Sequence, residues 1–313
     1  MKKVDASRLN HLTSWSMKIK DYLLVKKQLV EDSLHRFMLE SDGTFDDHIE
    51  AMCYSLFAGG KRVRPILCLA AAEAITDDPR FLDELLLVSC AIECIHTYSL
   101  IHDDLPAMDN DELRRGRPTN HIVHGEAEAI LAGDGLLTFA FELLSNPKSD
   151  LPQLNRLQII NLIAQAAGPK GMVGGQSLDI AGENNDISFE QLQRIHRSKT
   201  GALIRCSVQA GGIGAGATDE EFTCLSEYGT SIGLAFQIVD DLLDATSTTE
   251  LLGKTAGVDQ QLGKATYPSL FGVEKTRDLA LNAVDSAKQA LIPLGDKAKL
   301  LTDLADYIYL RTC

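Results

Sequence analysis

The stretch Phe236–Asp244 reads FQIVDDLLD and carries three aspartates in an otherwise apolar segment. Side chains four residues apart lie on one face of an α-helix, so Asp240 and Asp244 share a face and Asp241 lies one step round. Carboxylates grouped on an apolar helix repel one another and lose hydration, a cost that is understandable where hard cations occupy the site. Mg²⁺ prefers a few carboxylates, retained waters and phosphate oxygens. The stretch therefore predicts a helix that carries part of a magnesium site.

A second aspartate group lies in the stretch IHDDLPAMDNDELRRGRP, residues 101–118. Asp103 and Asp109 are six residues apart, and a regular helix would place them on different faces. Pro106 stands between them and interrupts the helical hydrogen bonds. We therefore predict a kink or a loosened turn that brings Asp109 back toward Asp103. The candidate metal ligands from both groups are Asp103, Asp104, Asp109, Asp240 and Asp244.

A run of aspartates on one helix is usually a solvated face, and Asp109-Asn110-Asp111 taken alone favours that interpretation. Two separate Asp-Asp pairs, each preceded by an apolar segment, are harder to explain in this way. About 137 residues separate the pairs in the sequence. They meet only in a bundle whose helices surround a common cavity, which is a known location for such sites.

The rest of the chain also has helical periodicity. Apolar residues recur at three- and four-residue spacing over 82–95, 232–243 and 280–291, and turn-rich stretches lie between such segments. Ser188 and Gln191 have the spacing of a helix N-cap and its N3 partner. No segment shows the sustained alternation of a strand. We predict an all-α fold in which residues 1–313 form one domain of roughly ten or more helices around a central cavity.

Composition excludes several classes of function. The formal net charge of the 313 residues is -14, which argues against nucleic-acid binding and against electrostatic docking to an anionic membrane. The seven cysteines include no CxxC pair and favour reduced thiols. We found no signal peptide and no uninterrupted apolar run long enough for a membrane span, so we expect a cytoplasmic protein without stable membrane anchoring.

An anionic ligand would therefore need local cations. Basic residues gather in Gly59–Pro65, in Arg114–Arg117 and around Lys199, and guanidinium groups suit phosphate oxygens. We interpret Arg62 and Arg117 as solvated. His96 lies seven residues before Asp103, near the same helix face, and is a candidate diphosphate contact. His121 and His124 lack a third ligand and are interpreted as structural.

These residues together resemble the trans-prenyltransferase family, the polyprenyl synthetases. The resemblance runs from about Leu56 to the C-terminus. The stretches that carry it are GGKRVRP, ECIHTYSLIHDDLPAMDNDELRRGRPTNH, EAILAGDGLLTFAF, GMVGGQSLDI, IHRSKTGALIR, GLAFQIVDDLLD and GKTAGVDQQLGKATYP. The N-terminal 50 or so residues add little to it.

The resemblance implies the isoprenoid synthase fold, a homodimer and three Mg²⁺ ions. It implies that Asp103 and Asp109 bind two of these ions, and that Asp240 and Asp244 serve the third. The residues that it assigns to the allylic diphosphate are Arg114, Lys199 and Lys254. Those that it assigns to isopentenyl diphosphate are Lys61, Arg64, His96 and Arg115. Thr200 and Gln237 would face the reacting carbons.

The reaction that the resemblance implies is ionisation of the allylic diphosphate, condensation with isopentenyl diphosphate and loss of a proton. Lys199 would add a carbonyl dipole as well as its charge. Tyr98 lies five residues, about 7.5 Å of helical rise, before Asp103, and its bulk would stop a growing chain, whereas Ser99 is too small to do so. In the family an aromatic residue here accompanies a C15 product. The expected product is therefore farnesyl diphosphate, with geranylgeranyl diphosphate as the alternative.

Two other functional hypotheses stay open. A class I terpene cyclase also carries an aspartate-rich helix, but the second Asp-Asp pair and the cations for a second diphosphate favour condensation. A non-catalytic helical interaction protein would be expected to have lost carboxylates or cations, and all of them are present in this sequence.

Overall fold

The computed structural model describes residues 6–40, 42–183, 185, 187–246 and 265–310. Its α-helices are α1 Ala6–Phe37, α2 Asp46–Leu56, α3 Val63–Glu73, α4 Leu82–Asp103, α5 Asn120–His124, α6 Glu126–Leu144, α7 Gln153–Ala167, α8 Met172–Gly182, α9 Phe189–His196, α10 Ala202–Gly214, α11 Asp219–Thr246, α14 Tyr267–Phe271, α15 Val273–Ala290 and α16 Lys299–Leu310. Shorter turns are η1 Pro79–Phe81, the π-helical η2 Arg197–Gly201 and η3 Ile292–Ala298. The predicted all-α fold with ten or more helices is confirmed.

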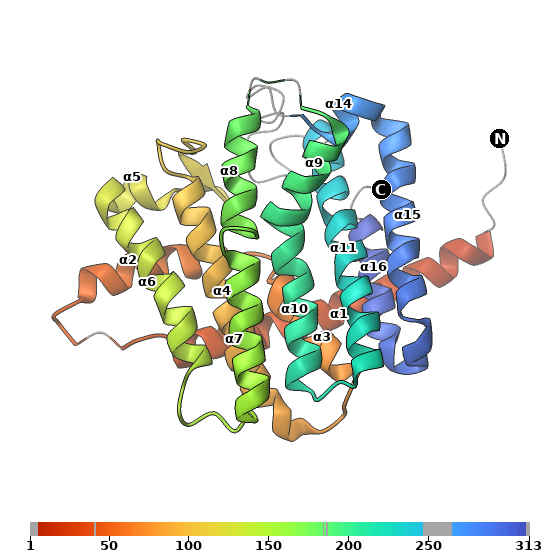
Figure 1. Cartoon of the computed structure of the whole chain (residues 1–313), viewed down its shortest axis with the longest axis horizontal. Helices are drawn as coiled ribbons and strands as arrows, with labels where there is room; N and C mark the ends of the chain where they lie inside the picture. The colour runs from red at the N-terminus through yellow and green to blue at the C-terminus, as the bar shows by residue number, and fades with distance from the viewer. Residues whose placement is uncertain (1–5, 41, 184, 186, 247–264, 311–313) are drawn as a thin grey trace.

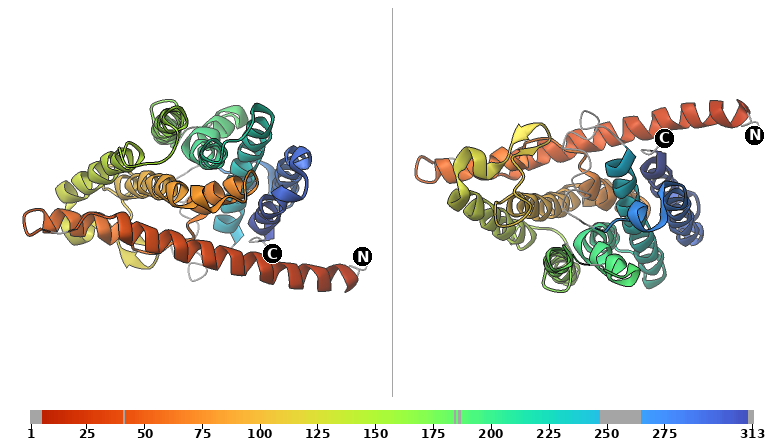
Figure 2. Two further views of the ribbon diagram at one scale, coloured as in Figure 1. Left: turned by 90° about the horizontal axis from the view of Figure 1, so that it is seen from below. Right: turned by 90° about the horizontal axis from the view of Figure 1, so that it is seen from above.

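The longer helices α4, α6, α8, α10, α11 and α15 stand side by side across the molecule (Figure 1). Helix α1 crosses behind them and extends beyond the bundle on one side (Figure 2). It packs against α3, α4 and α16. Helices α4 and α11 both end near the upper rim of the bundle in Figure 1, so the two aspartate groups lie at the same end of the fold.

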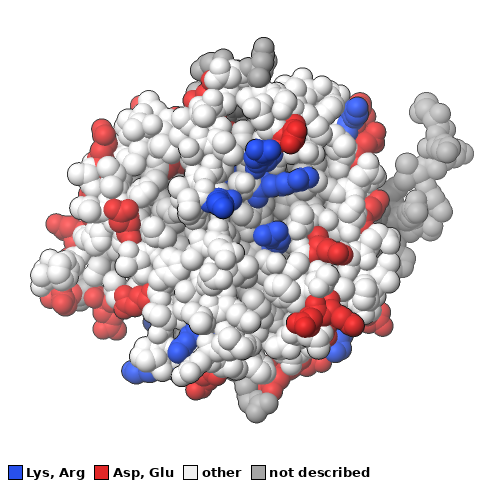
Figure 3. All heavy atoms as spheres, in the orientation of Figure 1, with Lys and Arg blue, Asp and Glu red and all other residues white. Residues whose placement is uncertain are grey.

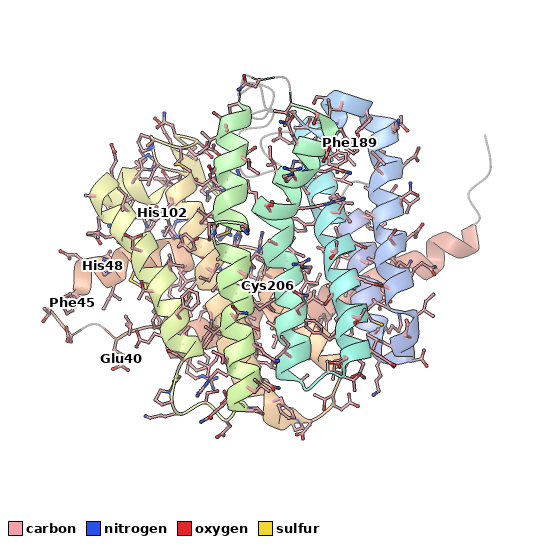
Figure 4. All side chains as sticks on the ribbon, viewed as in Figure 1. Glu40, Phe45, His48, His102, Phe189 and Cys206 are labelled. Carbon is pink, nitrogen blue, oxygen red and sulfur yellow. The ribbon has the colours of Figure 1, made fainter. Side chains whose placement is uncertain are left out.

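The buried apolar side chains form two clusters that share helices α3 and α10. One cluster joins these helices to α4, α6 and α7, and the other joins them to α11, α15 and α16. Cys206 on α10 belongs to the first cluster (Figure 4). Fully burying one Leu or Ile side chain stabilises a fold by about 1.5–3 kcal/mol, so both clusters contribute strongly to holding the aspartate-bearing helices in place.

Local signals set several element boundaries. Ser188 caps α9 through a capping box with Gln191, as predicted from their spacing. A short hairpin, β1 Leu113–Arg114 with β2 Arg117–Pro118, was not predicted. Its turn residues Arg115 and Gly116 both have positive φ, at 55° and 74°, which is the geometry of a type I′ hairpin turn.

Helix α4 has the length and mean hydropathy of a membrane span over Asp83–Asp103, but 72% of its apolar window is buried inside the bundle. A core helix with neighbours on every side has the same composition. Its apolar character therefore has an explanation within the fold.

Helices α3 and α10 approach closely at Gly211, where a Cβ atom would overlap the carbonyl oxygen of Cys68. We expect Gly211→Ala to lower the free energy of unfolding by about 2 kcal/mol, because an overpacking cost of about 3 kcal/mol exceeds the ~1 kcal/mol gained in helix propensity. Urea denaturation followed by circular dichroism measures this loss.

The adjacent Gly212 is the matched control for that prediction. A Cβ atom there would lie 2.6 Å from a terminal methyl carbon of Leu225, which can rotate away, rather than against backbone. Gly212→Ala should lose at most half as much stability as Gly211→Ala. Equal losses at the two positions would contradict the role assigned to the backbone contact.

Candidate active site

A cavity of about 470 Å³ opens at the end of the bundle where α4 and α11 terminate. Its walls carry carboxylates, cations and amides from six parts of the chain. The acidic residues that line it are Asp103, Asp109, Asp111, Glu112, Asp179, Asp240, Asp241 and Asp244. Arg114, His196, Lys199, Thr200 and Gln237 also line it. The fold thus brings the two aspartate groups to one cavity.

The first aspartate group lies where α4 ends and the chain reverses. Asp109 N donates to the carbonyl oxygen of Asp103 at 2.9 Å, and Asn110 N donates to that of Leu105 at 3.1 Å. Asn110 has a left-handed backbone, with φ 53°. The predicted turn around Pro106 is confirmed, and it takes the form of a helix end followed by a compact reversal rather than a kinked helix.

Asp104 is set apart from the other carboxylates of the two groups. It is 3% exposed, is absent from the cavity wall, and accepts hydrogen bonds from Arg114 Nε at 2.7 and 2.8 Å. Burial raises the pKa of Asp104 to about 6, and the Arg114 guanidinium opposes that rise. Successive helical residues point in different directions, so Asp103 faces the cavity and Asp104 faces inward, where it fixes Arg114 at the cavity wall.

The second aspartate group lies in the last turns of α11. Asp240 and Asp244 line the cavity together, as the four-residue spacing predicts. Asp241 is 4% exposed and accepts from Gln237 Nε2 at 2.9 Å and from the backbone N–H of Tyr267 at 3.0 Å. These two bonds orient Gln237 and join α11 to the start of α14. Phe189 on α9 (Figure 4) packs edge-on against Tyr267, with ring centroids 5.6 Å apart.

Lys199 and Thr200 reach the cavity from the π-helical turn η2. π-Helical turns are rare in proteins, and those that occur are often found at functional sites. Lys199 Nζ lies 2.7 Å from Asp179 Oδ2 on α8. The backbone of the turn packs closely against Gly175 of α8 and Gly233 of α11. A Cβ atom at residue 175 would overlap the backbone nitrogen of Lys199. Two glycines thus let the turn sit between two helices.

Helix α8 contributes two residues that the sequence analysis did not single out. Gln176 Nε2 donates to Asp103 Oδ1, and Asp179 pairs with Lys199. The two residues are three apart and therefore lie on one face of the helix. The signal was present in the stretch GMVGGQSLDI, whose polar Gln176 and Asp179 are spaced to face a neighbour while glycines permit close approach.

The cations assigned to a second diphosphate form a separate group. Arg115 donates to the carbonyl oxygen of Gly59, and its guanidinium fills the space beside Gly60. Burial holds the pKa of His96 well below its usual value. The positive charges of Arg64, Arg115 and Arg114 lower it further. Burial also lowers the pKa of Arg64. Lys61 is exposed beside this group. A neutral imidazole among arginines is an environment that favours an anion.

Arg62 is not the solvated residue that the sequence suggested. Only 2% of it is exposed, and its Nη1 donates to Glu93 Oε1 at 2.7 Å while Nη2 donates to the carbonyl oxygen of Leu56 at 2.7 Å. Its φ of 50° places it in the left-handed region before α3. The long-range partner Glu93 is 31 residues away, so no local pattern indicates this burial.

The remaining predicted residues are placed as follows. Tyr98 on α4 is 5% exposed and belongs to the buried core. Its ring centroid lies 5.7 Å from that of His102, and it is not part of the cavity wall. Ser99 is half-buried and donates to the carbonyl oxygen of His96 at 2.7 Å. Lys254 lies outside the described residues.

The other three residues interpreted from sequence as structural or solvated keep that character. His121 is 7% exposed and lies 3.1 Å from Thr119 Oγ1 through Nδ1. The ring of His124 packs edge-on against Tyr54. Arg117 is exposed, with its guanidinium 4.6 Å from the centroid of the Tyr54 ring.

The donor set of the cavity fits Mg²⁺. Asp103, Asp109, Asp240 and Asp244 offer only hard carboxylate oxygens, the ligands that this ion prefers. Within the described part of the chain, no three acidic, histidine or cysteine side chains converge on one point as a closed metal cage would require. Mg²⁺ usually binds through one or two carboxylates, waters and substrate phosphates, so an open arrangement of facing carboxylates suits it.

Comparison with known proteins identifies the family of the chain. Residues 46–292 match the family model described as polyprenyl synthetase. The chain is 46% identical over 276 residues to farnesyl diphosphate synthase of Geobacillus stearothermophilus, covering 88% of this chain and 92% of that protein. It is 45% identical over 291 residues to geranylgeranyl diphosphate synthase of Cyanophora paradoxa, covering 93% and 95%.

Solved structures resemble the whole bundle. The structure of an FPP/GFPP synthase from Zymomonas mobilis superposes with a TM-score of 0.83 at 38% identity, covering 94% of this chain and 99% of that one. The fold is therefore the isoprenoid synthase fold, as the resemblance implied. A family match over most of the chain, relatives above 40% identity and the facing aspartate groups agree, and the chain belongs to the polyprenyl synthetase family of short-chain trans-prenyltransferases.

Proposed function

We propose that this short-chain trans-prenyltransferase condenses isopentenyl diphosphate with dimethylallyl diphosphate and then with geranyl diphosphate to give (2E,6E)-farnesyl diphosphate. Enzymes of this family use isopentenyl and allylic diphosphates as substrates and Mg²⁺ as their metal. The observation that carries the proposal is the single cavity in which Asp103 and Asp109 face Asp240 and Asp244. A separate group of cations beside it suits a second diphosphate.

The two proposed diphosphate sites use different residues. Arg114 and Lys199 line the carboxylate cavity and would hold the allylic diphosphate, with Lys254 as a further contact expected from sequence. Lys61, Arg64, His96 and Arg115 would hold isopentenyl diphosphate. Because Arg64 interacts electrostatically with Asp240, the two sites are neighbours, as joining two substrates requires.

Asp103, Asp109, Asp240 and Asp244 are the residues that would hold Mg²⁺, and we propose three ions with substrate bound. When bound, Mg²⁺ neutralises charge on the diphosphate oxygens. Asp104 acts indirectly, because it holds Arg114 at the cavity wall.

The chain's own groups then support ionisation and condensation. Arg114 and Lys199 stabilise the negative charge that develops on the departing diphosphate, and because they are held in place they need little reorganisation. Thr200 and Gln237 line the cavity where the reacting carbons would lie. Exclusion of water protects the allylic cation from capture. The released diphosphate is the proposed base that removes the final proton.

Tyr98 is the proposed floor that limits chain length. It is buried on α4, about 7.5 Å of helical rise before Asp103. We expect Tyr98→Ala to shift the main product from C15 to C20 or longer, because removing the ring opens space for another isoprene unit. Chromatography of dephosphorylated products measures the shift.

Ser99→Ala is the control for this prediction, since it removes a neighbouring hydroxyl without changing bulk and should leave the product length unchanged. An unchanged C15 profile in Tyr98→Ala would remove Tyr98 as the floor. A wild-type product of C20 would instead establish the alternative, a geranylgeranyl diphosphate synthase. Relatives bearing both names match this chain at similar identity, so this measurement decides between the two products.

The proposed activity is tested by supplying isopentenyl diphosphate with each allylic primer, with and without Mg²⁺. Farnesyl diphosphate formed only with the metal supports the proposal. Hydrocarbon formed from farnesyl diphosphate alone would instead indicate the less favoured terpene cyclase.

We propose a cytoplasmic homodimer. Large apolar side chains are exposed on the adjacent helices α5, α6 and α7, among them Ile122, Leu131 and Leu157 at 51%, 52% and 63%. Exposed apolar surface on neighbouring elements is typical of a protein interface. Light scattering coupled to size exclusion should give twice the chain mass of 34.1 kDa.

A further inference from the structure

A second cavity, of about 230 Å³, lies outside the site described above. It is bounded by the α7–α8 connection, the turn η2 and the facing sides of α10 and α11. Its polar wall consists of the cations Lys170, Arg197 and Arg205 and the hydroxyl groups of Ser198 and Thr230. Basic side chains gather near the middle of this face of the molecule, whereas acidic ones lie mostly toward its edges (Figure 3).

The charge of this cavity is opposite to that of the whole chain. The net charge is -14, yet no carboxylate is among the residues that line the cavity. Within the described part of the chain, Lys170, Arg197 and Arg205 form no ion pair, whereas Arg62, Arg114 and Lys199 all do. Water and salt weaken the repulsion among these three exposed cations, and an anion bound between them would remove what remains.

One turn separates this cavity from the active site. Lys199 and Thr200 face the carboxylate cavity, whereas Arg197, Ser198 and Gly201 of the same five-residue turn face the second cavity. His196 lines both cavities, and its buried Nδ1 has no hydrogen-bond partner among the described residues. A buried polar atom without a partner is costly unless a ligand or water completes it.

We propose that this second cavity is a binding site for a phosphate-type oxyanion, and that its ligand is inorganic diphosphate, the co-product of the reaction. Two guanidinium groups and one ammonium group supply charge-assisted donors, the strongest recognition elements for such oxygens. Ser198 and Thr230 add hydroxyl donors. Ala202 and Leu234 supply apolar wall between these polar groups.

Occupancy of the site slows turnover. A bound anion joins Arg197 on the turn to Arg205 on α10 and Lys170 beside α8, and so restrains the turn that carries Lys199. Release of product diphosphate requires the contact between Lys199 and the diphosphate to break. A restrained turn slows the movement of Lys199 and therefore this release. This coupling rests on the proposed role of Lys199, whereas binding in the second cavity does not.

Binding is tested by calorimetric titration of inorganic diphosphate into the full chain in EDTA. We expect Arg205→Ala and Lys170→Ala each to raise the Kd about tenfold, the effect of losing one charge-assisted hydrogen bond. Arg194→Ala, which removes an exposed arginine on α9 outside the cavity, should change the Kd less than twofold. No measurable binding, or a Kd that responds to Lys199→Ala but not to Arg205→Ala, overturns the site.

Coupling is tested by steady-state kinetics with added diphosphate at saturating substrates. Without added diphosphate, Arg205→Ala and wild type should have the same kcat. With it, kcat of wild type should fall at least twofold and that of Arg205→Ala should not. Equal inhibition of both would overturn the coupling, and if the calorimetric difference persists the binding site stands. Failure of the chain to make any prenyl product would refute the proposed function without changing the calorimetric result.

Discussion

Asp103→Ala is expected to lower kcat about 10³-fold at saturating Mg²⁺, the size of effect seen when one group that stabilises transition-state charge is removed. Asp103 ends α4 at the cavity wall, receives a hydrogen bond from Gln176 and is bonded through its backbone to Asp109. Removing its carboxylate takes away the centre of the first aspartate group. Asp240→Ala should have a similar effect from the opposite wall.

The control is Asp83→Ala at the other end of the same helix. Asp83 is exposed and lies 3.4 Å from Arg36, a surface pair of little energetic value. Its removal should change kcat less than twofold. Near-normal turnover of Asp103→Ala with Mg²⁺ would refute the metal assignment, whereas a loss in both variants would point to a general effect on the helix.

Gly175→Ala is expected to lower kcat about 10²-fold, although residue 175 contacts no substrate. A Cβ atom there would overlap the backbone nitrogen of Lys199, so the turn or α8 must shift. A displacement of about 1 Å in a positioning group can cost that factor. Both Lys199 and its partner Asp179 lie on the moving elements, so allylic diphosphate binding should weaken as well. Steady-state kcat and KM for geranyl diphosphate measure the two effects.

Gly182→Ala, seven residues further along α8, is the matched control. A Cβ atom there meets only side-chain atoms, of Ile187 at 3.3 Å and of Ile195 at 3.8 Å, and activity should be unchanged. Urea denaturation of both variants separates displacement of the turn from unfolding. If folded Gly175→Ala turns over as wild type does, the close contact does not position Lys199.

The sequence predicted those parts of the site that depend on local geometry. Helical spacing placed Asp240 and Asp244 on one face, and Pro106 predicted the reversal that returns Asp109 toward Asp103. Both are consequences of backbone rules that act within a few residues. The all-helical fold followed from apolar periodicity for the same reason.

The features that sequence missed depend on partners far along the chain. Arg62 is buried because Glu93 and the carbonyl of Leu56 receive its guanidinium. Asp104 turned out to hold Arg114 rather than to line the cavity, and adjacent aspartates in a sequence do not reveal which one faces inward. Gln176 meets Asp103 across 73 positions. Such pairs arise from packing between helices, which periodicity alone does not specify.

A crystal structure of the full chain with isopentenyl diphosphate, a non-ionising thiolo analogue of geranyl diphosphate and Mn²⁺ would locate the metal through its anomalous signal. We expect ions about 2 Å from carboxylate oxygens of Asp103, Asp109 and Asp240, with the analogue's diphosphate beside Lys199 and Arg114. Ions bound away from these carboxylates, or a diphosphate bound outside the cavity between them, would contradict this expectation.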